Sequence, residues 1–111
     1  MPQIKLCKFS ELVEIDSRGF VISDVTPERN IFIVRRGDEV YGYENSCPHN
    51  FMPMDWSPDV FLSHDNEYIQ CANHGALFEI GNGICIYGPC MGQSLQPVQI
   101  EVHENIVFAV L

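Results

Sequence analysis

The sequence places four side chains that bind soft metals in two short segments. A C-x-H pattern runs from Cys47 to His49, a C-x2-H pattern runs from Cys71 to His74, and residues 50–70 separate them. Each segment supplies one thiolate and one imidazole, so bringing the two together would create a pocket of two Cys and two His. A mixed sulfur and nitrogen pocket of this kind suits an iron–sulfur cluster or a zinc ion.

The spacing of these residues favours iron–sulfur over zinc. Zinc sites of this composition usually keep a close Cys pair apart from a His pair at helical spacing, whereas here each segment mixes the two residue types. Both segments also lie in sequence rich in Gly, Pro and Asn, at residues 45–53 and 72–75, which predicts loops and not helices. We therefore expect two loops that share an iron–sulfur cluster, with a zinc ribbon-like site as the alternative.

The two segments resemble the cluster-binding boxes of the Rieske [2Fe–2S] family, in which two His replace two Cys on one iron. A third segment, residues 88–90 (Gly-Pro-Cys), resembles the family's proline-containing loop, which covers the cluster from its open side. The similarity extends from about residue 20 to the C-terminus. It implies one [2Fe–2S] cluster per chain, with Cys47 and Cys71 on one iron and His49 and His74 bound to the other through Nδ1.

The same resemblance gives an expectation for the reduction potential. High-potential members carry an extra Cys in each box, which form a disulfide, where this chain has Met52 and Asn73. They also carry a Ser and a Tyr whose hydroxyls donate to the cluster sulfurs, where this chain has Ala76 and Phe78. Such donors stabilise the added electron, so their absence predicts a potential near the low end of the roughly −150 to +300 mV range of Rieske centres. We also expect little pH dependence around pH 7.

Size and charge limit the classes of function. The 111 residues predict a single domain over residues 1–111, and six basic against 15 acidic residues argue against nucleic-acid binding. There is no apolar run of about 18 residues, so no membrane span is expected. The N-terminal sequence lacks a signal-peptide pattern, which predicts a cytoplasmic protein. A net charge of −9 suits transient docking on a basic face of a redox partner.

Three further cysteines, Cys7, Cys85 and Cys90, are expected to be reduced thiols and not metal ligands. We expect Cys7 to be a small buried hydrophobic residue in the first strand. The sequence leaves open whether Cys85 and Cys90 only pack in the interior or are redox-active.

The pattern of apolar residues and turns predicts an all-β fold, namely a Rieske-type antiparallel β-sandwich built from both termini, with a cluster-binding subdomain of two ligand loops at about residues 41–93. A helical turn capped by Ser10 is expected at residues 10–14, and Gly-Asn-Gly at residues 81–83 predicts a hairpin. The segment 52–62 predicts a small satellite core or, alternatively, an apolar partner surface at Phe51, Met52 and Trp56. The predicted strands cover residues 4–8, 20–24, 30–35, 40–44, 68–70, 76–80, 84–87, 98–102 and 106–110.

Together with these features, the resemblance implies a one-electron carrier, which we expect to be the ferredoxin component of an oxygenase system. Its expected partners are a reductase and a terminal oxygenase or reductase, with no small-molecule substrate. The remaining histidines, His64 and His103, fall in different predicted turns, so a second, catalytic metal is not expected. The alternatives are the small Rieske-like subunit of a nitrite-reductase-type enzyme and a metal-stabilised interaction domain.

Overall fold

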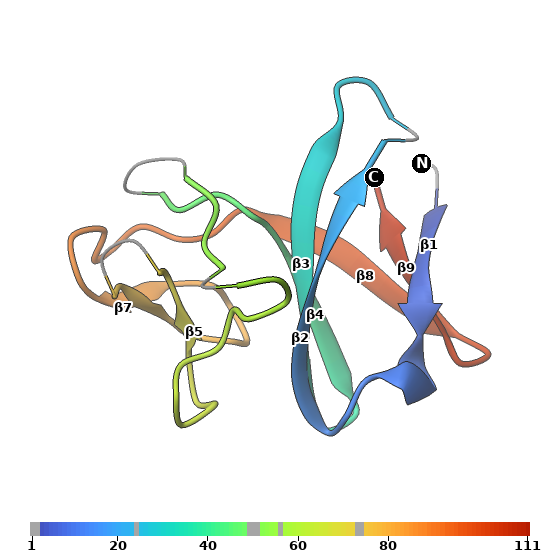
Figure 1. The fold of residues 1–111 in the computed structure, drawn as a ribbon, viewed down its shortest axis with the longest axis horizontal. Helices are drawn as coiled ribbons and strands as arrows, with labels where there is room; N and C mark the ends of the chain where they lie inside the picture. Colours follow the sequence, from blue (N-terminus) through green and yellow to red (C-terminus); the bar gives the residue numbers. More distant parts are fainter. Residues whose placement is uncertain (1–2, 24, 49–51, 56, 73–74) are drawn as a thin grey trace.

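The computed structural model describes residues 3–23, 25–48, 52–55, 57–72 and 75–111. Within these ranges the regular structure is antiparallel β-strand apart from one short 3-10 turn, which confirms the all-β prediction. A large sheet and a small sheet lie side by side, with the chain termini together at the far side of the large one (Figure 1). No helix in the described part of the chain is long and apolar enough to cross a membrane.

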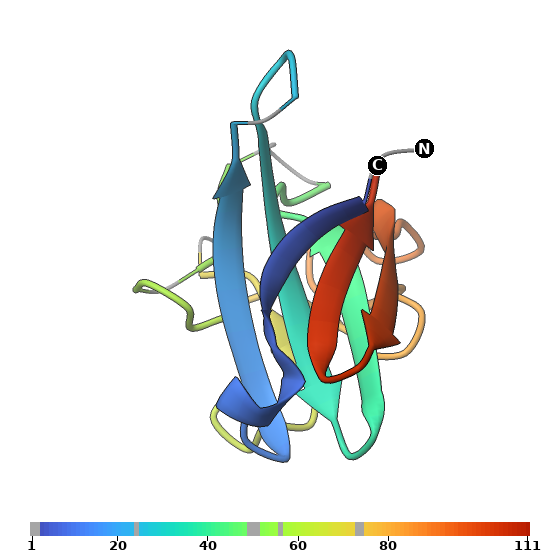
Figure 2. The same cartoon turned by 90° about the vertical axis from the view of Figure 1, so that its right-hand side faces the viewer.

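The large sheet has the strand order β1-β9-β8-β4-β3-β2, and the small sheet has the order β5-β6-β7. The large sheet bends over on itself and so forms two layers (Figure 2). The bend lies between β4 and β8, which pair only at Gly42 with Val98 and at Tyr43 with Pro97. A Cβ on Gly42 would lie 2.6 Å from the Ile100 side chain, so glycine permits this close approach. The strands are β1 (Gln3–Lys8), β2 (Ile15–Ile22), β3 (Arg29–Arg36), β4 (Glu39–Glu44), β5 (Ile69–Gln70), β6 (Leu77–Phe78), β7 (Cys85–Tyr87), β8 (Pro97–His103) and β9 (Ile106–Val110).

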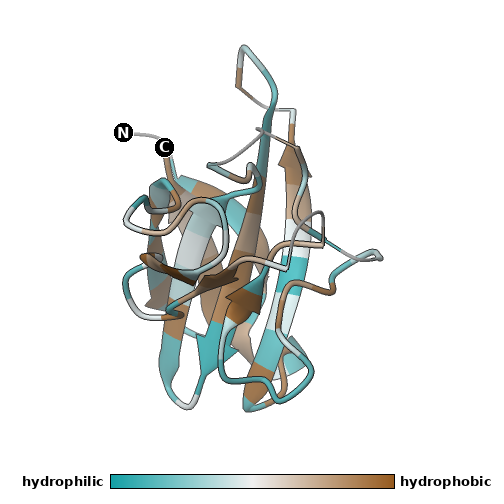
Figure 3. Ribbon diagram, turned by 90° about the vertical axis from the view of Figure 1, so that its left-hand side faces the viewer, coloured by the Kyte–Doolittle hydropathy of each residue, from teal (hydrophilic) through white to brown (hydrophobic). Residues whose placement is uncertain are grey.

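The centre of β3, residues 31–34, is buried on both of its faces, because hydrophobic clusters pack against each face. Ile31 and Ile33 belong to the cores between the two layers of the large sheet, whereas Phe32 belongs to the core shared with the small sheet. Successive side chains of a strand point to opposite faces, so four consecutive apolar residues can serve two cores. Figure 3, viewed from the side of the small sheet, shows hydrophobic stretches along both that sheet and the long strands behind it.

Residues 52–62 contribute to the core that the large sheet shares with the small sheet. The satellite-core prediction expected such a contribution. Met54 and Phe61 are fully buried, and the Phe61 ring stacks on Phe32 at 4.3 Å between centroids. This core is therefore continuous with the large sheet instead of being an isolated satellite. Met52 is half exposed, while Phe51 and Trp56, the other members of the predicted partner surface, lie outside the described residues.

Three local predictions were wrong in their limits. Strand β6 covers Leu77–Phe78 and not residues 76–80. Strand β2 begins at Ile15 and not at residue 20. Residues 15–19 lack an apolar pattern, but they form a strand because β2 pairs with β3 along its full length. The helical turn spans Phe9–Glu11, so Ser10 is not its cap. The Glu11 carboxylate instead accepts a 2.8 Å hydrogen bond from the Lys8 N–H, while Ser10 bonds to Asn105.

Other local predictions are confirmed. The Gly-Asn-Gly segment turns the chain between β6 and β7, with the Gly83 N–H donating to the Glu79 carbonyl at 2.8 Å. Cys7 lies in β1 and is buried.

Tyr43 joins the large sheet to the small one. Its hydroxyl donates a 2.5 Å hydrogen bond to the carbonyl of Ile80, the residue that begins the turn after β6. Burial, together with the neighbouring Tyr41 phenol, raises the pKa of Tyr43 to about 12. The neutral hydroxyl is therefore the form that the folded protein stabilises.

We expect Tyr43→Phe to destabilise the protein by about 1–3 kcal/mol, because the buried Ile80 carbonyl loses its donor. The hydroxyl's contribution is fully present below pH 10 and is lost as the pH rises toward 12, since the unfolded state releases the phenolic proton first. Urea unfolding midpoints at pH 8 and pH 11 measure both effects. Tyr41→Phe is the matched control, and an equal loss in the two variants would contradict the assignment.

Candidate functional site

The structure brings two of the four predicted ligands, Cys47 and Cys71, into one buried core. Both side chains have 0 % exposure, and both belong to the hydrophobic cluster between the two sheets. The other two predicted ligands, His49 and His74, lie outside the described residues. The placement of the imidazoles therefore remains a prediction, whereas the burial of the thiols is observed.

The first loop leaves β4 and is closed by its own backbone. The Cys47 N–H donates to the Met52 carbonyl at 3.0 Å. At the start of the loop the Asn45 side chain accepts a 2.8 Å hydrogen bond from the Met54 N–H and donates to Asp55 at 3.3 Å. Asn45 thus holds the two ends of the loop together.

Asn45 was not among the residues expected from the sequence to shape the site. The only signal was an Asn at the end of a strand, directly before a proline-containing loop, where its short side chain competes for backbone groups. The backbone group that Asn45 binds depends on the path by which the loop comes back to β4, and the local sequence does not specify that path.

The second loop connects β5 to β6. The Cys71 N–H donates to the Ala76 carbonyl and the Gly75 N–H donates to the Cys71 carbonyl, each at 2.9 Å. The Ala72 N–H donates to the Met54 carbonyl of the first loop at 2.9 Å. The two loops are therefore joined by a main-chain hydrogen bond next to Cys71, which fixes their relative position.

This setting fits a metal cluster better than an isolated pair of thiols. A buried thiolate is costly without a cation to compensate its charge, and coordination to a metal supplies that cation. Phe78 and Ala76, both fully buried in the same core, help to exclude water. Among the described residues no three His, Cys, Asp or Glu side chains form a metal site, so Cys85 and Cys90 do not complete one with Cys47 or Cys71.

The predicted covering segment packs against the second loop. Gly88 has a φ of +106°, and a Cβ there would lie 2.9 Å from the Ala76 Cα. Cys90 is buried in the same core as Cys47, and this burial raises the pKa of the Cys90 thiol. Residues 88–90 therefore cover one side of the core that contains the two thiols. We call residues 88–91, which follow β7, the covering loop.

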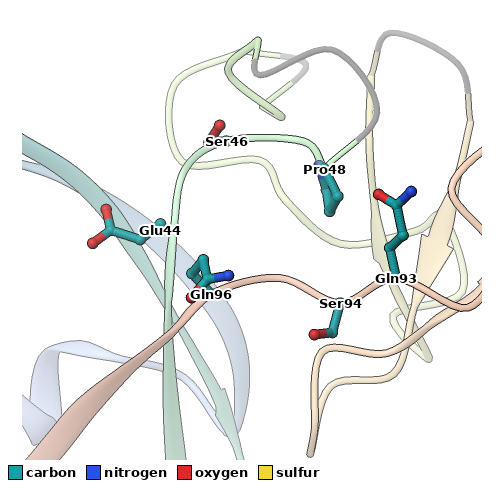
Figure 4. Close-up of a pocket in the computed structure, with 6 residues that line it drawn as sticks. All are labelled: Glu44, Ser46, Pro48, Gln93, Ser94 and Gln96. Atoms are coloured by element: carbon teal, nitrogen blue, oxygen red, sulfur yellow. The ribbon is translucent and has the colours of Figure 1, made fainter.

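A pocket of about 410 Å³ opens beside the first loop. Figure 4 shows Pro48 on one side of it and Gln93 on the other. The charged member of its lining is Glu44, which forms an ion pair with Arg29. The pocket offers no nucleophile and base together, so its described lining does not support hydrolytic chemistry. It is lined by Glu44, Ser46, Pro48, Gln93, Ser94 and Gln96.

The remaining histidines lie apart from the thiols in the chain. His103 ends β8 and is exposed, with its ring nitrogen 2.9 Å from the Glu101 carboxylate. His64 is exposed in the turn that precedes β5. Neither belongs to a cluster of metal-binding side chains among the residues that the structure describes.

Comparison with known proteins identifies the family. The family model for the Rieske [2Fe-2S] domain matches residues 3–104. The family therefore implies one [2Fe–2S] cluster for this chain, and the two buried thiols fit it. A search of curated protein sequences gave no match.

Solved structures share the fold. A chain in a complex of reduced oxygenase and oxidised ferredoxin of carbazole 1,9a-dioxygenase has a TM-score of 0.77 and 23 % identity, over 97 % of this chain and 92 % of that one. The ferredoxin of carbazole 1,9a-dioxygenase from Nocardioides aromaticivorans IC177 has a TM-score of 0.77 and 20 % identity, over 99 % and 98 %. The terminal oxygenase of the enzyme from Novosphingobium sp. KA1 has a TM-score of 0.77 and 14 % identity, over 98 % of this chain and 29 % of that one.

We expect Gly88→Ala to destabilise the protein more than Gly92→Ala. Both glycines have positive φ, at +106° and +90°, but a Cβ on Gly92 meets nothing within 4 Å, whereas one on Gly88 would clash with Ala76. The clash should add about 1–3 kcal/mol to the backbone strain that the two variants share. Urea unfolding midpoints measure the difference. Equal losses would show that the covering loop does not press on the second loop.

Proposed function

We propose that this chain, which belongs to the Rieske [2Fe–2S] domain family, is a one-electron carrier whose cluster is bound by Cys47, His49, Cys71 and His74. The observation that carries the proposal is the burial of one thiol from each loop in a single core, beneath a covering loop. The cluster, when bound, supplies reversible storage of one electron. The protein holds the ligands in place, excludes water from the thiolate ligands and sets the polarity around them.

The polarity around the thiols favours a low reduction potential. Ala76 and Phe78 are fully buried in the core that contains Cys47 and Cys71, and neither side chain has a hydrogen-bond donor. An added electron therefore gains no hydroxyl donor from these two positions. The net charge of −9 acts in the same direction, although salt screens charges on the surface.

The proposed role is that of a ferredoxin in an oxygenase system in the cytoplasm. Support comes from the extent of the structural match, since this chain covers 98 % of a dioxygenase ferredoxin but 29 % of a terminal oxygenase. The partners would be a reductase that delivers electrons and a terminal oxygenase that receives them. The acidic balance of the chain suits brief contact with basic faces of such partners, because complementary charge speeds their encounter.

We expect the wild-type protein to take up one electron per chain in an anaerobic reductive titration, with a Rieske-type EPR signal in the reduced state. Cys47→Ala and Cys71→Ala should each lose both iron and electron uptake, because a thiolate ligand is missing. Cys7→Ala is the matched control, since Cys7 is also a buried thiol but lies in the large sheet, and it should keep both. Bound zinc without electron uptake would instead indicate a metal-stabilised interaction domain.

We expect Ala76→Ser to raise the midpoint potential by an amount on the order of tens of millivolts, because a hydroxyl beside the second loop can donate to the cluster sulfurs. Ala109→Ser makes the same chemical change at an equally buried position in the large sheet and should leave the potential unchanged. Redox titration of both loaded variants measures the effect. An unchanged or lower potential in Ala76→Ser would contradict the polarity argument.

A further inference from the structure

Two thiols outside the proposed ligand set lie in contact. Cys85, on β7, and Cys90, on the covering loop, are free cysteines with their sulfur atoms 3.2 Å apart. A disulfide needs about 2.05 Å, so a small rotation of the two side chains would bring the sulfurs within bonding distance. The described residues offer no third ligand to make this pair a metal site.

The backbone already holds these two residues together. The Cys85 N–H donates to the Gln93 carbonyl at 2.8 Å, and the Cys85 carbonyl accepts a 3.3 Å hydrogen bond from the Gly92 N–H. The Gln93 N–H in turn donates to the Cys90 carbonyl at 2.9 Å. Both thiols therefore lie at the base of a short loop whose two ends are joined by these hydrogen bonds. A bond between the sulfurs consequently requires little backbone movement.

The pair is buried but lies beneath an exposed loop. Cys85 and Cys90 are 2 % and 1 % exposed, whereas Tyr87, at the end of β7, and Met91, on the covering loop, are 64 % and 65 % exposed. Local opening of this short surface loop would admit a small reagent without unfolding either sheet. Cys7 is also buried, but its core cluster in the described part of the large sheet contains no second thiol.

We propose that Cys85 and Cys90 are a reversible modification site, which forms an intrachain disulfide by exchange with an oxidised low-molecular-weight disulfide such as glutathione disulfide. The Cys85 thiolate attacks the small disulfide, whose S–S bond breaks and releases one small thiol. The Cys90 sulfur then attacks Cys85 Sγ in the mixed disulfide, forms the Cys85–Cys90 bond and releases the second small thiol. The two cysteines lose two electrons and two protons, and the two released thiols carry them away.

The order of attack follows from the environment of Cys90. Burial and the hydrogen bond to Cys85 raise the pKa of the Cys90 thiol to about 12. The Cys90 thiol also donates its proton to the Cys85 sulfur at 3.2 Å, so Cys85 is the sulfur whose thiolate its neighbour stabilises. Cys85 therefore attacks first, and Cys90 acts second, when the mixed disulfide lies beside it. The resulting bond would join β7 to the covering loop and fasten that loop against Ala76.

The experiment treats the loaded protein with glutathione disulfide and glutathione at a series of ratios. Samples are quenched in acid, denatured, alkylated and weighed by intact mass spectrometry, with peptide mapping to locate the bond. We expect the wild type to lose two alkylation sites, located at Cys85 and Cys90, and to regain both on treatment with dithiothreitol. Cys90→Ser should instead stop at a mixed disulfide on Cys85, while Cys7→Ser should behave like the wild type.

Retention of all alkylation sites at ratios that oxidise a reference dithiol would overturn the proposal, as would a bond that maps to other cysteines. A second readout concerns the covering loop and rests on the proposed cluster, whereas the first does not. The oxidised wild type should release iron to a chelator several-fold more slowly than the reduced form, with no such difference in Cys90→Ser. Equal rates in the oxidised and reduced wild type would overturn the fastening of the loop while leaving the electron-carrier proposal intact.

Discussion

The burial of β3 on both faces is the constraint on which the rest of the structure depends. Ile31 and Ile33 fill the space between the layers of the large sheet, and Phe32 and Val34 form the floor of the core beneath the small sheet. The stacking of Phe61 on Phe32 holds the segment 52–62 against β3, and the hydrogen bond from Tyr43 to Ile80 holds the small sheet against the large one. The small sheet has only two or three residues per strand, so it depends on this support for a defined position.

From this base the two loops are positioned mainly by main-chain hydrogen bonds. Each loop closes on itself, through Cys47 with Met52 and Cys71 with Ala76, and the bond from Ala72 to Met54 joins them. Polar groups of the backbone are thereby satisfied inside the protein, while the surrounding side chains are apolar. The site consequently combines fixed thiols with buried Ala76 and Phe78 side chains that supply no hydroxyl donor, and both properties suit a carrier that must change charge with little rearrangement.

Much of this could be predicted from the sequence, because the informative patterns are local. The spacing of Cys47, Cys71 and their neighbouring histidines predicted the family, and the Gly-Asn-Gly turn predicted the hairpin between β6 and β7. The first half of β2 was missed, since residues 15–19 lack an apolar pattern and are held by pairing with β3. Asn45 was recognisable only as a loop residue, and Gly88 only as part of the predicted covering segment, because their partners, Met54 and Ala76, are brought near by the tertiary fold.

The central proposal is that a cluster between these loops stores one electron at low potential, in surroundings without hydroxyl donors at Ala76 and Phe78. The midpoint potential of the wild-type protein, followed by the reduced-state EPR signal in anaerobic titrations at pH 7 and pH 9, tests it most directly. We predict a potential near the low end of the roughly −150 to +300 mV range, with little change between the two pH values. A potential near the high end that falls steeply between pH 7 and pH 9 would contradict the proposal.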